Sequence, residues 1–141
     1  MAGLSPKLPL ARSLEDGYWG LNKTFLATTK QNFKNLILTI PGERVMNPSF
    51  GVGLLTFLFS QQGEFTEEHV RAKIVEQAGI YLPHINLVDV EILSSFHNLE
   101  ISVNALVIRI TYRIIPLNQD DILNITIDPD KQTILETVPL L

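Results

Sequence analysis

The stretch Asn35–Phe59 reads NLILTIPGERVMNPSFGVGLLTFLF, and the other parts of the chain are best understood in relation to it. An apolar run opens the stretch and another closes it, with a turn-rich, charged segment between them. A long connection inside a small domain is usually functional or packed by its own side chains. We therefore expect a rigid loop here, with a framework made of Pro41, Gly42, Pro48, Phe50 and Gly51.

The loop carries an adjacent charged pair, Glu43 and Arg44, for which two interpretations remain open. In the first, both side chains satisfy backbone groups of the loop. In the second, Arg44 presents its planar guanidinium to a carboxylate or carbonyl of a partner, and Glu43 holds it in place. The two interpretations are compatible, so both residues are candidates for an interface.

Composition limits the class of protein. A chain of 141 residues with 45% hydrophobic and 18% charged residues can form one domain with a core. Its net charge of −4 and scattered basic residues disfavour a nucleic-acid partner. It has no cysteine, which excludes disulfides and thiolate metal sites. It has neither the apolar segment of a secretory signal nor the ~20 apolar residues of a membrane span, so we expect no membrane partner.

Hydrophobic periodicity predicts helices in the first part of the chain. Residues 22–38 place apolar side chains at a 3.6-residue period and should form a helix that ends before Pro41, with Asn22 or Thr24 as its cap. Leu54–Phe59 is best interpreted as a short helix, although its pattern also allows a buried strand. A third helix should follow Thr66, begin with two glutamates, and run to about Leu82.

The pattern then changes to the alternation that is typical of strands. Val88–Ile92 and Leu106–Ile114 alternate apolar and polar residues, and a third strand is expected at Ile122–Ile127. Between the first two, Leu99, Ile101 and Val103 alternate on the opposite parity. A bulge, turn or break therefore belongs near Asn104 and Ala105.

Together these elements predict an α+β fold: about three N-terminal helices followed by a small, mainly antiparallel three-stranded sheet with exposed edges. We expect an N-terminal arm at 1–20, a single domain at 21–128 and a C-terminal tail at 129–141, where Ile134–Leu141 are candidates for pairing with a partner. In the arm, Tyr18 and Trp19 either cover the core or anchor a partner subunit. Exposed strand edges are sites at which another chain can add.

Catalytic and cofactor motifs are weak. The three histidines lack metal-site spacing, no G-x-S-x-G elbow is present, and Gly51-Val-Gly53 lacks the Lys-Ser/Thr of a phosphate loop. The carboxylates Glu43, Glu64, Glu67 and Glu68 are better explained by capping or hydrogen bonding than by glycoside hydrolysis. We therefore expect no catalytic residue, cofactor or metal.

The order of residues from Leu38 to Gly51, Leu-Thr-x-Pro-Gly-Glu-Arg-x-Met-x-Pro-x-Phe-Gly, resembles the signature of the baseplate wedge, or sheath-initiator, family of contractile phage tails. Relatives occur in type VI secretion baseplates and phage-tail-like injection particles. The resemblance covers roughly residues 20–115 and extends through the strand at Leu106–Tyr112. One departure is clear, because this chain has Leu82-Pro83-His84 where the family usually carries Glu-Pro-Arg.

The resemblance implies a structural protein rather than an enzyme, located in the virion baseplate and assembled in the host bacterial cytoplasm. Its implied partners are the tail sheath protein, other baseplate wedge subunits and, as a further candidate, the tail tube or hub. The sheath's first ring would dock by strand exchange on the sheet, for which we name Ile108, Ile110, Tyr112 and Ile125. The wedge contact would involve Glu43, Arg44, Leu82, Pro83 and His84.

Two other functions stay open from sequence. Some members of the family have been described as lysozyme-like, so a tail-associated enzyme that degrades peptidoglycan is the alternative, although no carboxylate pair here supports it. A free-standing binding domain with an unknown partner is the third possibility.

Overall fold

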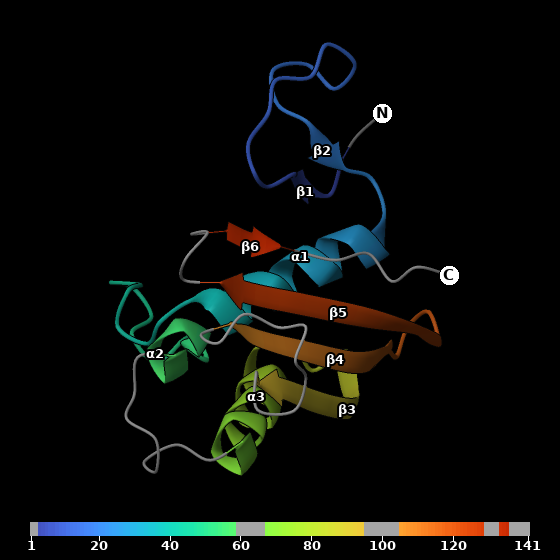
Figure 1. The fold of residues 1–141 in the computed structure, drawn as a ribbon. Coiled ribbons are helices and arrows are strands. Elements are labelled where there is room, and N and C mark those ends of the chain that lie inside the picture. The colour runs from blue at the N-terminus through green and yellow to red at the C-terminus, as the bar shows by residue number, and fades with distance from the viewer. Residues whose placement is uncertain (1–2, 59–66, 95–104, 129–132, 136–141) are drawn as a thin grey trace.

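The computed structural model describes residues 3–58, 67–94, 105–128 and 133–135. Within these residues the chain forms an N-terminal strand pair, three helices and an antiparallel sheet, in the order drawn in Figure 1. The α+β prediction is confirmed. Several expected features lie outside the described residues, namely the Thr66 cap, Glu64, the alternation at Leu99–Val103, and Asn104.

The helices are α1 (Phe25–Leu38), α2 (Leu54–Leu58) and α3 (Glu67–Tyr81). Helix α1 begins later than expected because Thr24, rather than Asn22, is its cap: the Thr24 hydroxyl accepts the Ala27 N–H at 3.2 Å. It ends at Leu38 because the next residues turn extended ahead of Pro41. The apolar run after the loop is a helix, which settles the choice that its pattern left open.

The main sheet has the order β3-β4-β5-β6, and all neighbouring strands are antiparallel. Its strands are β3 (Ile85–Ser94), β4 (Leu106–Ile114), β5 (Gln119–Asp128) and β6 (Thr133–Leu135). The fourth strand lies in the segment that we expected to be a C-terminal tail. It pairs with Thr126–Asp128 of its own chain, so this part of the segment already has a partner.

Strand β3 contains a bulge that the alternation alone did not reveal. The register with β4 shifts between Leu87 and Asp89, which leaves Val88 as the extra residue. Val88 is accordingly exposed, whereas Val90 is buried. The prediction that Val88 shares a face with Val90 is therefore wrong, because the bulge reverses the parity of the strand at this point.

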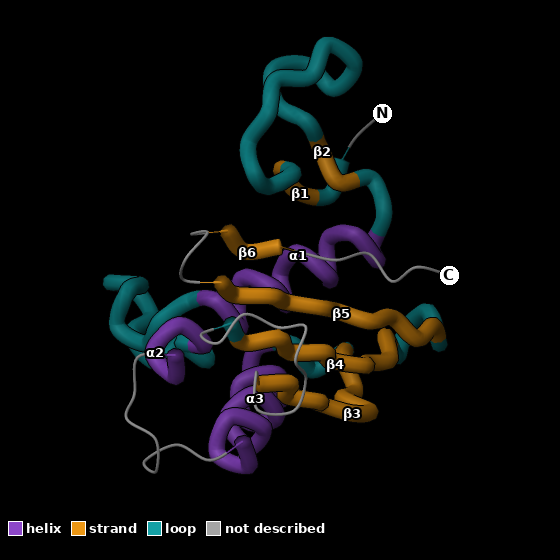
Figure 2. Tube along the Cα trace, viewed as in Figure 1, coloured by secondary structure: helices purple, strands orange, loops and turns teal. Residues whose placement is uncertain are grey.

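The core lies between one face of the sheet and the helices α1 and α3. In the view of Figure 2, α1 passes behind β5, and α3 lies beside β3. The even-numbered residues of β4 from Ile108 to Ile114 are buried and meet Phe33, Leu36 and Ile37 of α1 in one apolar cluster. The ring of Tyr112 packs edge-on against Phe33, with the centroids 5.1 Å apart. This arrangement fixes the end of α1, and therefore the start of the loop at 39–53.

The N-terminal arm projects from one end of α1 (Figure 1), and its strands β1 (Ser5–Pro6) and β2 (Leu21–Asn22) pair with each other. Gln31 of α1 ties the arm down: its amide oxygen accepts the Leu8 N–H, and its amide nitrogen donates to the Pro6 carbonyl, each at 2.9 Å. Tyr18 and Trp19 are 61% and 41% exposed, so they do not cover the core.

Candidate protein–protein interfaces

The loop between α1 and α2 is held by its own backbone. The Gly42 N–H donates to the Pro48 carbonyl at 2.8 Å and closes the outer part of the loop. The Val52 N–H donates to Leu36 at 3.0 Å and the Gly53 N–H to Thr39 at 2.9 Å, which joins the returning chain to the end of α1. The expected rigidity therefore has a structural cause, since each of these bonds fixes a different part of the connection.

Gly51 is the position in the loop at which an added side chain would collide most closely with its surroundings. Its φ angle is +117°, and a Cβ placed there would lie 2.2 Å from the carbonyl oxygen of Thr39. The close approach allows the Gly51 N–H to donate to the Gln77 side chain of α3 at 3.0 Å. This bond links the loop to α3, whereas the bond from Val52 to Leu36 links it to α1, and the role of Gln77 was not predicted from the sequence.

Glu43 and Arg44 contact different groups. In the part of the chain that the structure describes, they form no ion pair with each other. The Glu43 carboxylate accepts the Ile40 N–H at 3.0 Å, as the backbone interpretation expected. The guanidinium of Arg44 lies over the ring of Phe50, 3.9 Å from its centroid, and Phe50 packs edge-on against Tyr81. An aromatic stack, not Glu43, orients Arg44.

Beyond Arg44 the loop presents two apolar side chains to solvent. Val45 is 91% exposed and Met46 is 97% exposed. Their exposure was not predicted from the sequence, although apolar residues at the tip of a constrained loop are the signal that could have found them. Arg44, Val45 and Met46, which we call the loop tip, thus combine a fixed cation with adjacent apolar area.

A pocket of about 230 Å³ lies beside the loop tip, lined by Asn32, Asn35, Leu36, Arg44, Phe50, Tyr81 and Leu82. Leu82 is buried in the core, so it supports this pocket from inside instead of offering an apolar contact on the surface. Pro83 is exposed, and the ring of His84 lies against that of Phe25 at 5.5 Å. Of the Leu82-Pro83-His84 set, Pro83 is therefore the residue most available to a partner.

The four residues named for sheath docking are core residues. Ile108, Ile110, Tyr112 and Ile125 are fully buried, and β4 has a neighbouring strand on each side. Their side chains face the helices and cannot reach an incoming chain. An added strand would have to pair with the backbone of a sheet edge. Such edge groups are found on β3, on β6 and on the part of β5 that β6 does not cover.

The two edges differ in length and cover. Since the N–H and C=O of a residue in an antiparallel pair point toward the same neighbour, alternate residues of β5 face away from β4. Strand β6 pairs with Thr126 and Asp128 in this outward set but with none of the residues between Gln119 and Ile125. Most of the outward-facing backbone of β5 is therefore not covered by β6.

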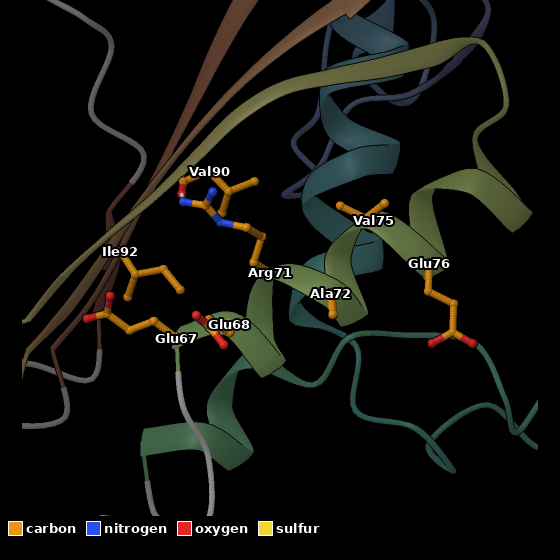
Figure 3. Close-up of a pocket in the computed structure, with 8 residues that line it drawn as sticks. All are labelled: Glu67, Glu68, Arg71, Ala72, Val75, Glu76, Val90 and Ile92. Carbon is orange, nitrogen blue, oxygen red and sulfur yellow. Dashed lines mark hydrogen bonds between the residues drawn. The ribbon is translucent and has the colours of Figure 1, made fainter.

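A groove of about 750 Å³ runs between α3 and β3, and Figure 3 shows the residues that line it. Its carboxylates, Glu67, Glu68 and Glu76, are exposed and all come from α3. Retaining and inverting glycosidases need two carboxylates that face each other across the substrate. The groove's lining offers no such opposed pair, and no His, Asp and Glu cluster of metal-binding geometry occurs among the described residues.

Two ion pairs shift the pKa values of their members. A hydrogen bond from Lys23 is the main cause of the lowered pKa of Asp16, aided by the Leu21 N–H. Asp120 has a lowered pKa because Arg113 donates to it at 2.6 and 3.0 Å. The first pair fastens the arm, and the second joins β4 to β5, so both are structural.

The loop tip and the sheet edges suit the binding of other proteins, as expected for a small α+β subunit of an assembly. The chain belongs to the baseplate wedge protein gp25 family, whose model matches residues 25–119. The description of this family makes the chain a baseplate component. No helix within the described ranges is long and apolar enough to cross a membrane.

Solved structures agree with this assignment. A chain in the cryo-EM structure of the anti-feeding prophage baseplate is 26% identical, with a TM-score of 0.60 over 77% of this chain and 82% of that one. A crystal structure described as a candidate tail lysozyme from Geobacter sulfurreducens is 22% identical, with a TM-score of 0.60 over 77% and 94%. The second likeness shows the fold alone. The search of curated proteins found no match.

Proposed function

We propose that this baseplate subunit joins the wedge through its loop tip and templates the first ring of the tail sheath through the β5 edge. In this proposal the sheath supplies an extended segment that pairs with outward-facing backbone groups of β5 by strand exchange. The particle assembles in the host bacterial cytoplasm, and the tail tube or hub is a further candidate neighbour.

The observation that carries the sheath contact is the short cover on β5. A three-residue strand makes few ladder hydrogen bonds, so an incoming strand could replace it and continue along the open part of the edge. The buried residues of β4 and β5 would keep their places during this exchange, because only the edge partner changes. The sheet would thus serve as a fixed template.

The loop tip is the surface best suited to the wedge. Its backbone is fixed before binding, so a partner does not have to order it. Arg44 would present its guanidinium to a carboxylate or carbonyl beside the apolar contacts of Val45 and Met46. We expect Arg44→Ala to lower particle yield more than Lys34→Ala, and equal wild-type yields from both would remove the loop tip from the proposal.

The sheath contact can be tested with one edge residue. Thr126 faces β6, so Thr126→Pro removes an N–H from the edge without removing a donor from the β4–β5 ladder. Thr126→Val is the matched control, because it keeps the N–H and the branched shape. Each purified variant is mixed with its cognate sheath protein under conditions in which sheath alone stays unassembled, and sheath tubes are counted by electron microscopy.

Thr126→Pro should abolish seeding, and Thr126→Val should retain it. Equal seeding by the two folded variants would show that the β5 edge is not the template. A larger truncation from residue 116 is unsuitable for this purpose. It would delete β5, whose Leu123, Ile125 and Ile127 belong to the core, so lost seeding would then report unfolding.

A further inference from the structure

The outer edge of β3 is occupied by two charged side chains from its own domain. The guanidinium of Arg71 in α3 donates to the carbonyl oxygen of Val90, and Figure 3 shows the Arg71 side chain reaching up to that strand. The carboxylate of Asp89 accepts the N–H of the same residue at 2.8 Å. Both backbone groups of Val90 are therefore bonded to side chains rather than to a strand.

Strand geometry places these two groups on the open side of β3. Val90 is opposite Ile110, and the N–H and C=O of one residue in an antiparallel ladder point in the same direction. Because Arg71 approaches from α3 and takes the carbonyl, this direction is away from β4. An added strand would need these same groups, so it would have to displace both side chains.

The contact differs from an ordinary surface ion pair. Arg71 and Asp89 lie 4.0 Å apart, at the limit of an ion pair, while each makes its shorter contact with Val90. Glu91 and Arg109, by contrast, are cross-strand neighbours on the exposed face and contact each other at 3.3 Å. The two pairs have similar exposure, but only the first occupies backbone groups.

The bulge at Val88 lies two residues before Val90 and bends the strand away from a regular ladder. Bulges and charged side chains are the devices by which natural sheets prevent edge-to-edge pairing. On the opposite edge, Asp121 likewise accepts the N–H of Ile122 at 2.9 Å, which would restrict an incoming strand to the part of β5 beyond Ile122.

We propose that Arg71 and Asp89 form a clamp on Val90 that closes the β3 edge, so that the free subunit does not pair with a second copy and the sheet accepts a strand on the β5 side only. The choice of the β5 side for the sheath rests on the proposed function. The closure of the β3 edge does not, because it can be measured on the subunit alone.

The test compares two double variants of the full chain that leave the net charge unchanged. Arg71→Met with Asp89→Ala removes the clamp, and Arg109→Met with Glu91→Ala removes the neighbouring pair on the exposed face. Methionine keeps the helix propensity of position 71. Amide NMR spectra are recorded over a series of protein concentrations, together with hydrogen exchange at Val90 and sedimentation velocity.

Without the clamp, the Val90 amide should exchange about two- to tenfold faster in dilute protein, which corresponds to the loss of one hydrogen bond. The amide shifts of Val90 and Ile92 should become concentration-dependent as copies pair through β3, and sedimentation should show dimers. The control variant should behave as the wild type. A clamp variant whose shifts at Val90 and Ile92 do not change with concentration would overturn the proposal, whatever its exchange rate.

The sheath assay separates the two ideas. Loss of seeding in Thr126→Pro with no self-association of the clamp variant would support the sheath contact and reject the clamp. Normal seeding in Thr126→Pro with self-association of the clamp variant would reject the sheath contact and support the clamp.

Discussion

Substitution of Gly51 by alanine tests whether the loop is held as tightly as its contacts indicate. The added Cβ would lie 2.2 Å from the Thr39 carbonyl oxygen and 2.9 Å from its carbon, both of which are backbone atoms that cannot rotate away. Positive φ in a residue other than glycine costs about 1–3 kcal/mol. Overpacking costs about 1–3 kcal/mol more, so Gly51→Ala should lose roughly 2–6 kcal/mol of unfolding free energy.

Gly42→Ala is the matched control. Gly42 also has a positive φ of +96°, but no atom lies within 4 Å of the Cβ that would be added there. This variant should therefore lose only the strain of about 1–3 kcal/mol. The difference between the two variants isolates the steric contact with Thr39, and both substitutions change the unfolded chain in the same way.

The measurement is urea denaturation followed by far-ultraviolet circular dichroism, supported by thermal melts. In a domain of this size, each kcal/mol shifts Tm by about 4 °C, so Gly51→Ala should melt about 4–12 °C below Gly42→Ala. If the two variants have the same stability, the loop relaxes around the new side chain. The claim that its backbone is fixed before a partner binds would then be refuted.

Three further outcomes are expected. Met46→Ser should lower incorporation into particles more than Ile115→Ser, because Met46 belongs to the loop tip, and pull-down with wedge subunits would measure it. Gln31→Ala should release the arm, which the fluorescence of Trp19, the only tryptophan, and limited proteolysis would detect. The pKa of Asp16 in the folded protein is lowered from its ordinary value of 3.8. The bond to Lys23 therefore stabilises the folded arm at pH values above 3.8, and this stabilisation is lost as the pH falls through the lowered pKa. Acid titration of Trp19 fluorescence should therefore show arm release below pH 3.8, and Asp16→Asn should release the arm at neutral pH.

The helices and strands were predictable because their signals are local. The apolar spacing of α1, the proline after it and the alternation of β4 each depend on neighbours in the chain, and all three were confirmed. The prediction that Val88 faces the core was wrong, because a bulge depends on pairing with another strand. The short strand β6 was missed for the same reason, since its partner β5 defines it.

The candidate site divides in the same way. The loop was located from proline, glycine and charge. Glu43 satisfies a backbone group, which was one of the two interpretations that the sequence left open. The contact between Arg44 and Phe50 was not predicted from the sequence, because it requires the loop to fold back over Tyr81. Alternation identified Ile108, Ile110, Tyr112 and Ile125 as one face of strands, but only the packed helices show that this face is internal.

The sequence by itself determined the order of the three helices and the three long strands, the rigid turn-rich loop and the family to which the chain is similar. Each of these is encoded by residue types at fixed spacings. Tertiary structure decided which strands are edges, which apolar residues reach solvent, and which charges occupy backbone groups. Those properties arise between segments far apart in the chain, as when Arg71 of α3 meets Val90 of β3, and no local pattern records them.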